Sequence, residues 1–491
     1  MPETDLEAEM GDGATGTAVR RPAAGGPRRP RAARHTVAVL GTGVFAVGTD
    51  LFVVAGVLGG IATDLGVSVG SAGLVVTVFA LSYAAGAVLL GPLLSVRPPG
   101  RVLVVSAAAF AALNLLAALA PGFPVLLAVR LLAGLAASAY VPAAAAAAAA
   151  AMPASHRGRA LGTMVGCMSG ATVLGAPVGV LLASALSWRV AFALPAALAA
   201  VSVAGLVVAR DGLRPPTPTH PPGGPPSVGK SPPSVGKPPW PVGEASSPHG
   251  PGYRDGPQPG CPGPPFPRSR PSLPAPPPRS PRRAFPPHRC AAPVSWCGGA
   301  VRARLRPLGS PAVAATLAVT FLLMTASYST YTYLPQVLTG TAAPLGTGLF
   351  IALFGLAGTA GTWWGGSAAD RRGPGHAVGP AVAVTAAALA ALPHTAETAA
   401  GAAVAVVCWG TAVWGFVPAQ QHRLIGLGTA PPVLLLALHS GAVHLGSAAG
   451  SLLGGLVVET AGAGRLWTAA VLCCGAAWTV HTVLVRKENR S

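Results

Sequence analysis

Charged residues are scarce in this chain of 491 residues, of which only 10% are Asp, Glu, Lys or Arg. Water-soluble domains carry about 25% charged residues. Acidic residues are the rarest of these, with 14 Asp and Glu against 33 Lys and Arg. Because apolar residues make up 51% and the mean hydropathy is +0.56, the composition excludes an ordinary soluble domain. The net charge of +19 lies in tails and short loops between apolar runs, which argues against a nucleic-acid-binding surface.

The sequence motifs of common catalytic and metal-binding sites are also missing. The chain has no Walker A lysine loop, no His-Glu-x-x-His and no Gly-x-Ser-x-Gly, which argues against an ATP-powered pump on the same chain and against a membrane enzyme. Its seven cysteines match no zinc-binding spacing. We therefore predict no cofactor and no bound metal. The N-terminus up to Arg34 lacks a short apolar region before a cleavage site, so we expect no secretory signal there.

Long apolar runs occupy most of the chain. A membrane-spanning helix needs about 20 apolar residues, and backbone groups in lipid must be hydrogen-bonded within their own segment, so such runs predict helices. Twelve runs meet this requirement: residues 36–58, 71–94, 102–120, 125–150, 160–183, 189–209, 311–336, 346–367, 377–393, 400–420, 432–456 and 465–485. The predicted fold class is an all-α membrane protein with twelve transmembrane helices.

The basic residues gather at one end of these spans. If the N-terminus is inside, the inner segments hold most of the Lys and Arg, including Arg371, Arg372 and Arg423, and the outer loops hold almost none. The exceptions are Arg189 and Arg465, which stand at the outer starts of two spans. Lys and Arg are enriched in cytoplasmic loops. The pattern therefore predicts a multi-pass membrane protein with both termini in the cytoplasm.

Two long segments carry no apolar span. Residues 1–35 form a polar tail, and residues 211–310 contain 30 of the 52 prolines and 13 of the 33 basic residues. Such a segment cannot form a packed core, so we expect it to be disordered or polyproline-like. The predicted organisation is an N-terminal bundle of six helices (36–209), a Pro-rich cytoplasmic linker (210–310), a C-terminal bundle of six helices (311–485) and a short tail (486–491). The linker is interpreted as a tether, with protein docking, regulation or contact with anionic lipid as alternatives.

Four local sequence patterns stand out within the spans and loops. The stretch Gly48–Ala87 places an acid in the first span, an outer loop "DLGVS" and a second span with "ALSYAAGA". The fourth span has "RLLAGLAASAY", with Arg130 and Gly134 four residues apart. The fifth span has small residues at four- or five-residue spacing, which permits close helix approach; the motif residues are Gly166, Gly170, Gly175, Pro177 and Gly179.

The fourth pattern lies in the loop after the eighth span, "GGSAADRRGPG", and comprises Gly366, Asp370, Arg371 and Gly373. A weaker copy, "GPLLSVRPPGR", follows the second span and keeps Gly91, Arg97 and Arg101 but has Ser95 in place of the acid.

Together these patterns resemble the major facilitator superfamily, and in particular its bacterial twelve-helix drug:proton antiporters of the arabinose-efflux-like and chloramphenicol-efflux-like branch. The resemblance covers residues 36–209 and 311–485. It implies two pseudo-symmetric six-helix bundles, a role for Arg130 in proton coupling and an antiporter signature in the fifth span, although Ala176 separates the Gly-Pro pair that is usual there. It also implies that the two loops pin the cytoplasmic ends of helices and act in gating. The loop after the second span is altered, because Ser95 replaces the acid of the family pattern.

Asp50 is the only one of the fourteen acids that lies deep within a predicted span. An acid in this position is expensive unless it is paired or functional. Burial favours the neutral carboxyl and a nearby cation favours the ionised form, so a group between these influences can load and release a proton. We interpret Asp50 as the proton-coupling carboxyl, with Arg130 as its partner. The alternative is a neutral Asp that caps a kink near Gly48 or faces an outer vestibule.

Polar and aromatic residues of other spans are candidates for a substrate pocket. The seventh span, "MTASYSTYTYLPQ", places Tyr328 and Tyr331 on one helix face. The complete candidate set is Tyr83, Asn114, Tyr328, Tyr331, Gln336, Trp409, Trp414, His439 and His444. The alternatives are an interfacial belt for the aromatic residues and buried hydrogen bonding for the two histidines, which lie about 140° apart on their helix.

The predicted function is secondary active export of a small molecule, such as a drug, antibiotic or metabolite, across the plasma membrane of a bacterium, in exchange for protons by alternating access. The expected partners are the substrate, protons and the lipid bilayer, and we expect a functional monomer. Export of sugars, nucleosides or amino acids and uniport remain alternatives. A membrane sensor or scaffold that does not transport and acts through the Pro-rich linker is an alternative of another class.

Overall fold

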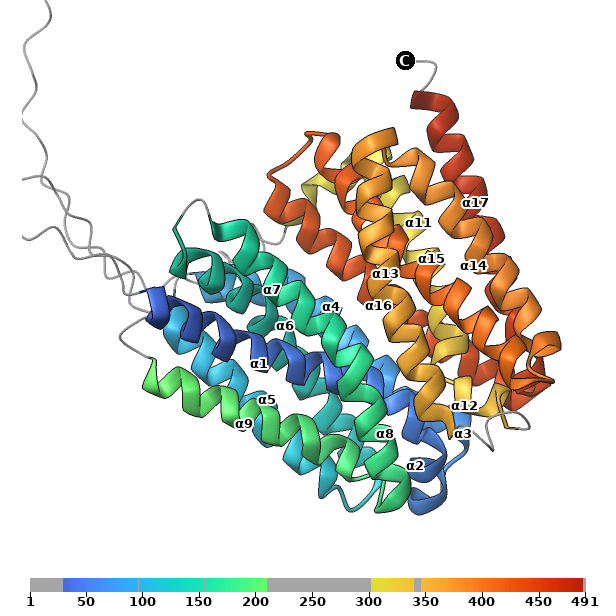
Figure 1. Cartoon of the computed structure of the whole chain (residues 1–491), viewed down its shortest axis with the longest axis horizontal. Helices are drawn as coiled ribbons and strands as arrows, with labels where there is room; N and C mark the ends of the chain where they lie inside the picture. The colour runs from blue at the N-terminus through green and yellow to red at the C-terminus, as the bar shows by residue number, and fades with distance from the viewer. Residues whose placement is uncertain (1–29, 96, 154–155, 210–301, 340–345, 489–491) are drawn as a thin grey trace, which may run out of the picture. The chain divides into compact units, whose positions relative to one another are not determined.

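The computed structural model describes residues 30–95, 97–153, 156–209, 302–339 and 346–488. Within these ranges every regular element is a helix, as Figure 1 shows. Twelve stretches are long and apolar enough to cross a membrane. This confirms the predicted fold class. The greater parts of the tail 1–35 and the linker 210–310 lie outside the described residues.

The first six spans are built from nine α-helical segments and two segments of other helix types. In chain order, the first span comprises α1 (Pro30–Val53), the 3-10 segment η1 (Val54–Val57) and α2 (Leu58–Leu65), and the second comprises α3 (Val69–Ala72) and α4 (Leu74–Ser95). The third and fourth are α5 (Pro99–Ala118) and α6 (Phe123–Ala151). The fifth comprises α7 (Arg157–Gly170), the π-helical segment η3 (Ala171–Gly175) and α8 (Ala176–Ala185), and the sixth is α9 (Val190–Val208).

The second six spans are more regular. After the short segment η5 (Arg306–Gly309) come α11 (Pro311–Tyr331) with α12 (Leu334–Val337), α13 (Gly346–Arg372), α14 (Gly375–Thr395), α15 (Ala399–Gly426), α16 (Pro432–Ala461), and η6 (Ala463–Arg465) with α17 (Leu466–Glu488).

Several helices extend beyond the ends that the apolar runs predict. Helix α1 begins at Pro30, within the predicted tail, because proline suits the first turn of a helix. Residues 302–309, at the end of the predicted linker, are helical too. Helix α15 continues to Gly426 and buries Arg423, which the sequence places in an inner loop; its guanidinium lies 3.3 Å from the His481 ring. Polar residues can continue a helix once an apolar run has ended, so hydropathy underestimates its length.

The first and fifth spans change helix type at their centres, where they also pack together. Beside the π-helical segment η3, a side chain on Gly175 would strike Thr49, and one on Gly179 would strike Val53. A side chain on Gly48 would strike Ala171, whose Cβ would stand 2.7 Å from the added carbon. These three glycines allow the backbones to approach closely around Asp50. Gly166, from the same predicted face, has open space beside it.

Glycines also bring α13 against two neighbouring helices. A Cβ on Gly355 would stand 2.8 Å from the backbone of Thr172 in η3. Further along α13, Gly361 and Gly365 meet the backbone of α15. The segment η3 therefore lies between α1 of the first six spans and α13 of the second six.

Candidate functional site

The described spans contain one ion pair that is shielded from solvent. Nη1 of Arg130 in α6 lies 2.7 Å from Oδ1 and 2.8 Å from Oδ2 of Asp50 in α1. The Arg130 and Asp50 side chains are 2% and 0% exposed. Sequence reasoning predicted this partnership but had no means of showing contact. A single nitrogen bridges both carboxylate oxygens, so the negative charge of Asp50 is balanced locally.

Aromatic rings and a backbone carbonyl enclose the Arg130 guanidinium. Its central carbon lies 4.2 Å from the centre of the Phe79 ring and 5.3 Å from that of Phe192. Its Nε donates to the carbonyl oxygen of Val75 at 3.4 Å. Cations interact favourably with aromatic faces, so these neighbours partly replace the water that the guanidinium has lost. The sequence did not indicate that either phenylalanine contacts Arg130.

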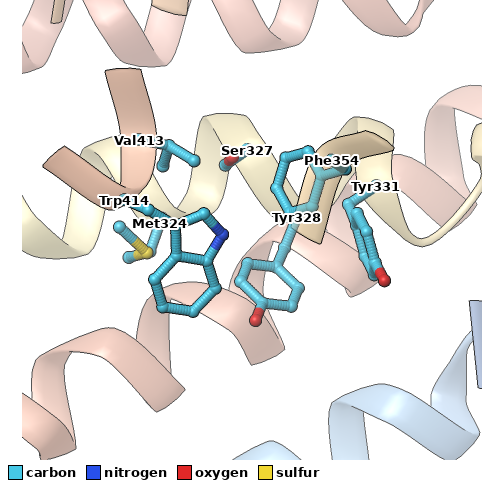
Figure 2. Close-up of a pocket in the computed structure, with 7 residues that line it drawn as sticks. All are labelled: Met324, Ser327, Tyr328, Tyr331, Phe354, Val413 and Trp414. Atoms are coloured by element: carbon cyan, nitrogen blue, oxygen red, sulfur yellow. The ribbon is translucent and has the colours of Figure 1, made fainter. Parts of the chain in front are cut away.

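Figure 2 shows a small cavity within the second six spans. Its lining residues come from α11, α13 and α15: Met324, Ser327, Tyr328, Tyr331, Phe354, Val413 and Trp414. The cavity measures about 10 Å³, roughly the space of one water molecule. Of the nine pocket residues predicted from sequence, Tyr328, Tyr331 and Trp414 lie here.

Phe52, two residues after Asp50, connects the ion pair to this cavity. Its ring centre is 6.1 Å from that of Tyr331 and 5.8 Å from that of Trp414. The Tyr331 hydroxyl donates to the carbonyl oxygen of Phe52 at 3.2 Å, one residue before α1 ends and η1 begins. Helix α1 therefore contacts the cavity wall directly, two residues from Asp50.

A second cavity of about 20 Å³ adjoins the first through Trp414. It lies between the fifth span and α13, and its hydroxyl groups belong to Ser169, Thr172, Thr359 and Thr362. The three threonine hydroxyls donate to carbonyl oxygens of their own helices.

Tyr83 and His444 meet each other rather than either cavity. Their rings stack with centres 3.8 Å apart and planes inclined by 11°. Nδ1 of His444 lies 2.8 Å from the carbonyl oxygen of Ser440. Tyr83 belongs to α4 and His444 to α16, so this stack joins the two sets of six spans. His439 is buried on another side of α16, and its Nε2 has no hydrogen-bond partner among the described residues.

The remaining predicted pocket residues line neither cavity. Trp409 is buried behind the first and donates from Nε1 to Ser327 Oγ at 2.6 Å. Asn114 is buried in α5 and donates to the carbonyl oxygen of Phe110 at 3.1 Å. Gln336 lies in α12. Aromatic and amide residues within apolar spans do not reveal which helix face they occupy, so sequence alone could not separate these three from the residues that line the cavities.

The charged residues of the two predicted loops lie at exposed helix ends. Asp370, at the end of α13, is 74% exposed, and its Oδ1 lies 3.9 Å from Nε2 of His422. Arg371, Arg97 and Arg101 are exposed as well. Gly373 adopts φ 86°, a conformation that favours glycine. Gly366 and Gly91 lie within helices α13 and α4.

At the other end of α4 and α16, polar contacts join the two sets of spans. The side chains of Ser68 and Ser71 donate to the Glu459 carboxylate. Close by, the Tyr333 hydroxyl donates to the carbonyl oxygens of Gly70 at 3.2 Å and Ser451 at 3.0 Å. This contact could not be predicted from the sequence, because the partners of Glu459 are almost 400 residues away in the chain.

Twelve helices with a buried ion pair in the first six and an aromatic cavity in the second six define a polytopic membrane protein of the transporter class. The family model described as Major Facilitator Superfamily matches residues 40–426, so the chain belongs to the major facilitator superfamily. This confirms the resemblance drawn from the four sequence patterns.

Relatives within the family are transporters and a resistance protein. A chloramphenicol resistance protein of Streptomyces lividans is 38% identical over 154 residues, 31% of this chain and 39% of that protein. The inner membrane transport protein YdhP of Escherichia coli (strain K12) is 26% identical over 427 residues, 87% of this chain and 89% of that protein.

Among solved structures, a mutant form of the nucleoside transporter NupG is similar in fold. It has a TM-score of 0.59 and 12% sequence identity, and the alignment covers 92% of this chain and 99% of that chain. At this identity the likeness concerns the fold alone.

Proposed function

We propose that this protein exports a small molecule, a drug, antibiotic or metabolite, across the bacterial plasma membrane in exchange for protons. The observation that carries the proposal is the buried Asp50–Arg130 pair, two residues from the ring that contacts the aromatic cavity. Asp50 is the proton-carrying group, and the cavity around Tyr331 and Trp414 is the substrate site. The names of the relatives support transport, and the resistance protein makes chloramphenicol the first substrate to test.

Protonation of Asp50 is coupled to conformational change by the charge on Arg130. A proton on the carboxylate leaves the guanidinium without its counter-charge, and breaking a buried ion pair costs about 3–5 kcal/mol. The pair is also closed to solvent as it stands, with both side chains at most 2% exposed. Loading a proton therefore requires that the helices around the pair open and admit water. Rocking of residues 36–209 against 311–485 provides this opening.

The direction of transport follows from the proposed orientation. With both termini in the cytoplasm, the contacts of Ser68, Ser71 and Tyr333 with α16 lie at the outer end of the spans. In the arrangement described here these contacts close the outer path. Opening them exposes Asp50 to external protons while the substrate leaves.

Transport by purified full-length protein in proteoliposomes tests the proposal, with chloramphenicol as substrate and an imposed pH gradient. The wild type should move chloramphenicol uphill when the pH gradient is present and should carry protons the other way. Asp50→Asn should lose this coupled proton movement, whereas Asp50→Glu, which keeps the charge, should retain part of it. Asp64→Asn is the matched control, because Asp64 belongs to an exposed pair with Arg189 near the end of the same span.

Two results would contradict the proposal. Coupled proton movement that is unchanged in Asp50→Asn would remove this residue from the mechanism. Chloramphenicol flux that equilibrates without responding to the pH gradient would indicate a uniporter.

A further inference from the structure

Trp414 forms the partition between two small cavities. It lines both the aromatic cavity of about 10 Å³ and the hydroxyl-lined cavity of about 20 Å³. Neither space alone admits more than one or two waters. A substrate that occupies both cavities must therefore touch the Trp414 side chain.

The indole nitrogen of Trp414 is an unused polar group of the aromatic cavity. The Tyr331 hydroxyl donates to the carbonyl oxygen of Phe52, and the Tyr328 side chain lies near that of Ser447. Ser327 accepts from Trp409. Nε1 of Trp414 is shielded from solvent and has no hydrogen-bond partner among the described residues. A buried donor without an acceptor is costly. An acceptor atom on a substrate would satisfy it.

The two cavities also define the charge of the substrate. No lining residue of either cavity is an acid or a base. The nearest candidate counter-ion for a cation, Asp50, already accepts both of its short hydrogen bonds from Arg130. Burial of an unpaired charge in such a site is unfavourable. Uncharged molecules avoid this cost.

We propose that Trp414 is a specificity-determining hydrogen-bond donor and that the substrate is an uncharged, partly aromatic molecule with an acceptor oxygen. This inference rests on the proposed function, whose substrate site it makes specific. The aromatic part lies against Tyr331 and Phe354, and the acceptor receives the Trp414 N–H. The more polar part faces Thr359 and Thr362.

Gly358 holds the indole ring at this place. A Cβ at position 358 would stand 2.5 Å from the Trp414 Cδ1 atom and 3.1 Å from Nε1. The absence of a side chain therefore lets the ring lie close against α13. Substitution by alanine would displace the ring and, with it, the N–H donor.

Equilibrium binding to full-length protein in detergent tests the inference without requiring proton coupling. Chloramphenicol is the uncharged probe, with amide and nitro oxygens as acceptors, and tetraphenylphosphonium is the lipophilic cation without an acceptor. The wild type should bind chloramphenicol more tightly. Trp414→Phe should weaken chloramphenicol binding about tenfold, the loss expected for one hydrogen bond, and leave tetraphenylphosphonium binding unchanged. Trp363→Phe is the matched control, since Trp363 lies on α13, a helix that lines both cavities, but is itself 74% exposed.

Each other outcome overturns the inference. Tighter binding of tetraphenylphosphonium, binding of neither probe, or equal weakening of both probes by Trp414→Phe would each exclude an acceptor-specific site for uncharged molecules. Unchanged chloramphenicol binding in Trp414→Phe would show that the N–H meets only water. Intact binding with no coupled proton movement would instead contradict the proposed antiport and leave the substrate class standing.

Discussion

Loss of either member of the Asp50–Arg130 pair should destabilise the protein with a different pH dependence, because only one of the two can lose its charge. Both side chains are closed to solvent, and the closest nitrogen–oxygen distance is 2.7 Å. In Asp50→Asn the guanidinium stays protonated at every accessible pH. In Arg130→Met the remaining carboxyl can take up a proton and become neutral.

The expected magnitudes follow from this difference. Removal of one partner from a buried pair costs about 3–5 kcal/mol, and Asp50→Asn should show this full penalty between pH 5 and pH 7. In Arg130→Met the loss of stability cannot exceed the free energy needed to protonate an ordinary carboxyl. That free energy is about 4 kcal/mol at pH 7 and about 1.5 kcal/mol at pH 5. The folded variant then holds a proton that the unfolded chain releases above about pH 4. Its stability therefore rises as the pH falls from 7 to 5.

The free energy of unfolding in mixed micelles, measured at pH 5, 6 and 7, tests this reasoning. The penalty of Arg130→Met relative to wild type should shrink by up to about 3 kcal/mol from pH 7 to pH 5, and that of Asp50→Asn should stay constant. The double variant, which buries no charge, should be more stable than Asp50→Asn. Equal, pH-independent penalties for the single variants, or additive penalties in the double variant, would refute the argument.

Two further predictions concern contacts between the two sets of six spans. Tyr331→Phe keeps the ring but removes the hydrogen bond to the carbonyl oxygen of Phe52. The ratio of protons to substrate moved in proteoliposomes should therefore fall, while the affinity for substrate stays within about threefold of wild type. An unchanged ratio would show that this bond does not link the cavity to the Asp50 carboxyl. Glu459→Gln weakens the acceptor of the Ser68 and Ser71 hydroxyls. A cysteine introduced at the buried position Thr330 should then react faster with a water-soluble thiol reagent than the same cysteine in a protein that keeps Glu459. An equal rate would show that Glu459 does not hold this end closed.

Much of the fold could be predicted because a bilayer imposes a simple rule on sequence. Each span must be long, apolar and helical, and all twelve appear at the predicted places with ends that differ by several residues. The shift from α-helix to 3-10 helix after Val53 and the π-helical segment Ala171–Gly175 were not predictable. Both depend on how the first and fifth spans pack, and apolar residues satisfy any helix type equally well.

The candidate site was predictable where a residue is chemically out of place. Asp50 and Arg130 stand out because charges in a span are expensive, and rarity alone suggested that they belong together. The set of candidates predicted from sequence included Tyr328, Tyr331 and Trp414, which line a cavity. It also included residues that line neither cavity, such as Asn114 and Gln336. Phe52, Phe79 and Phe354 could not be found, because an aromatic residue in an apolar helix is unremarkable until its neighbours are known.

The sequence by itself therefore determined that this chain spans a membrane twelve times and that a single deep carboxylate needs a partner. Both conclusions follow from the free energy of placing each residue in lipid, which depends on the residue and its position in the span. Only the tertiary structure decided which helix faces meet, that Arg130 bridges both oxygens of Asp50, and that the Trp414 N–H is left without an acceptor among the described residues. These depend on distances of a few ångströms between residues far apart in the chain, which hydropathy and spacing do not encode.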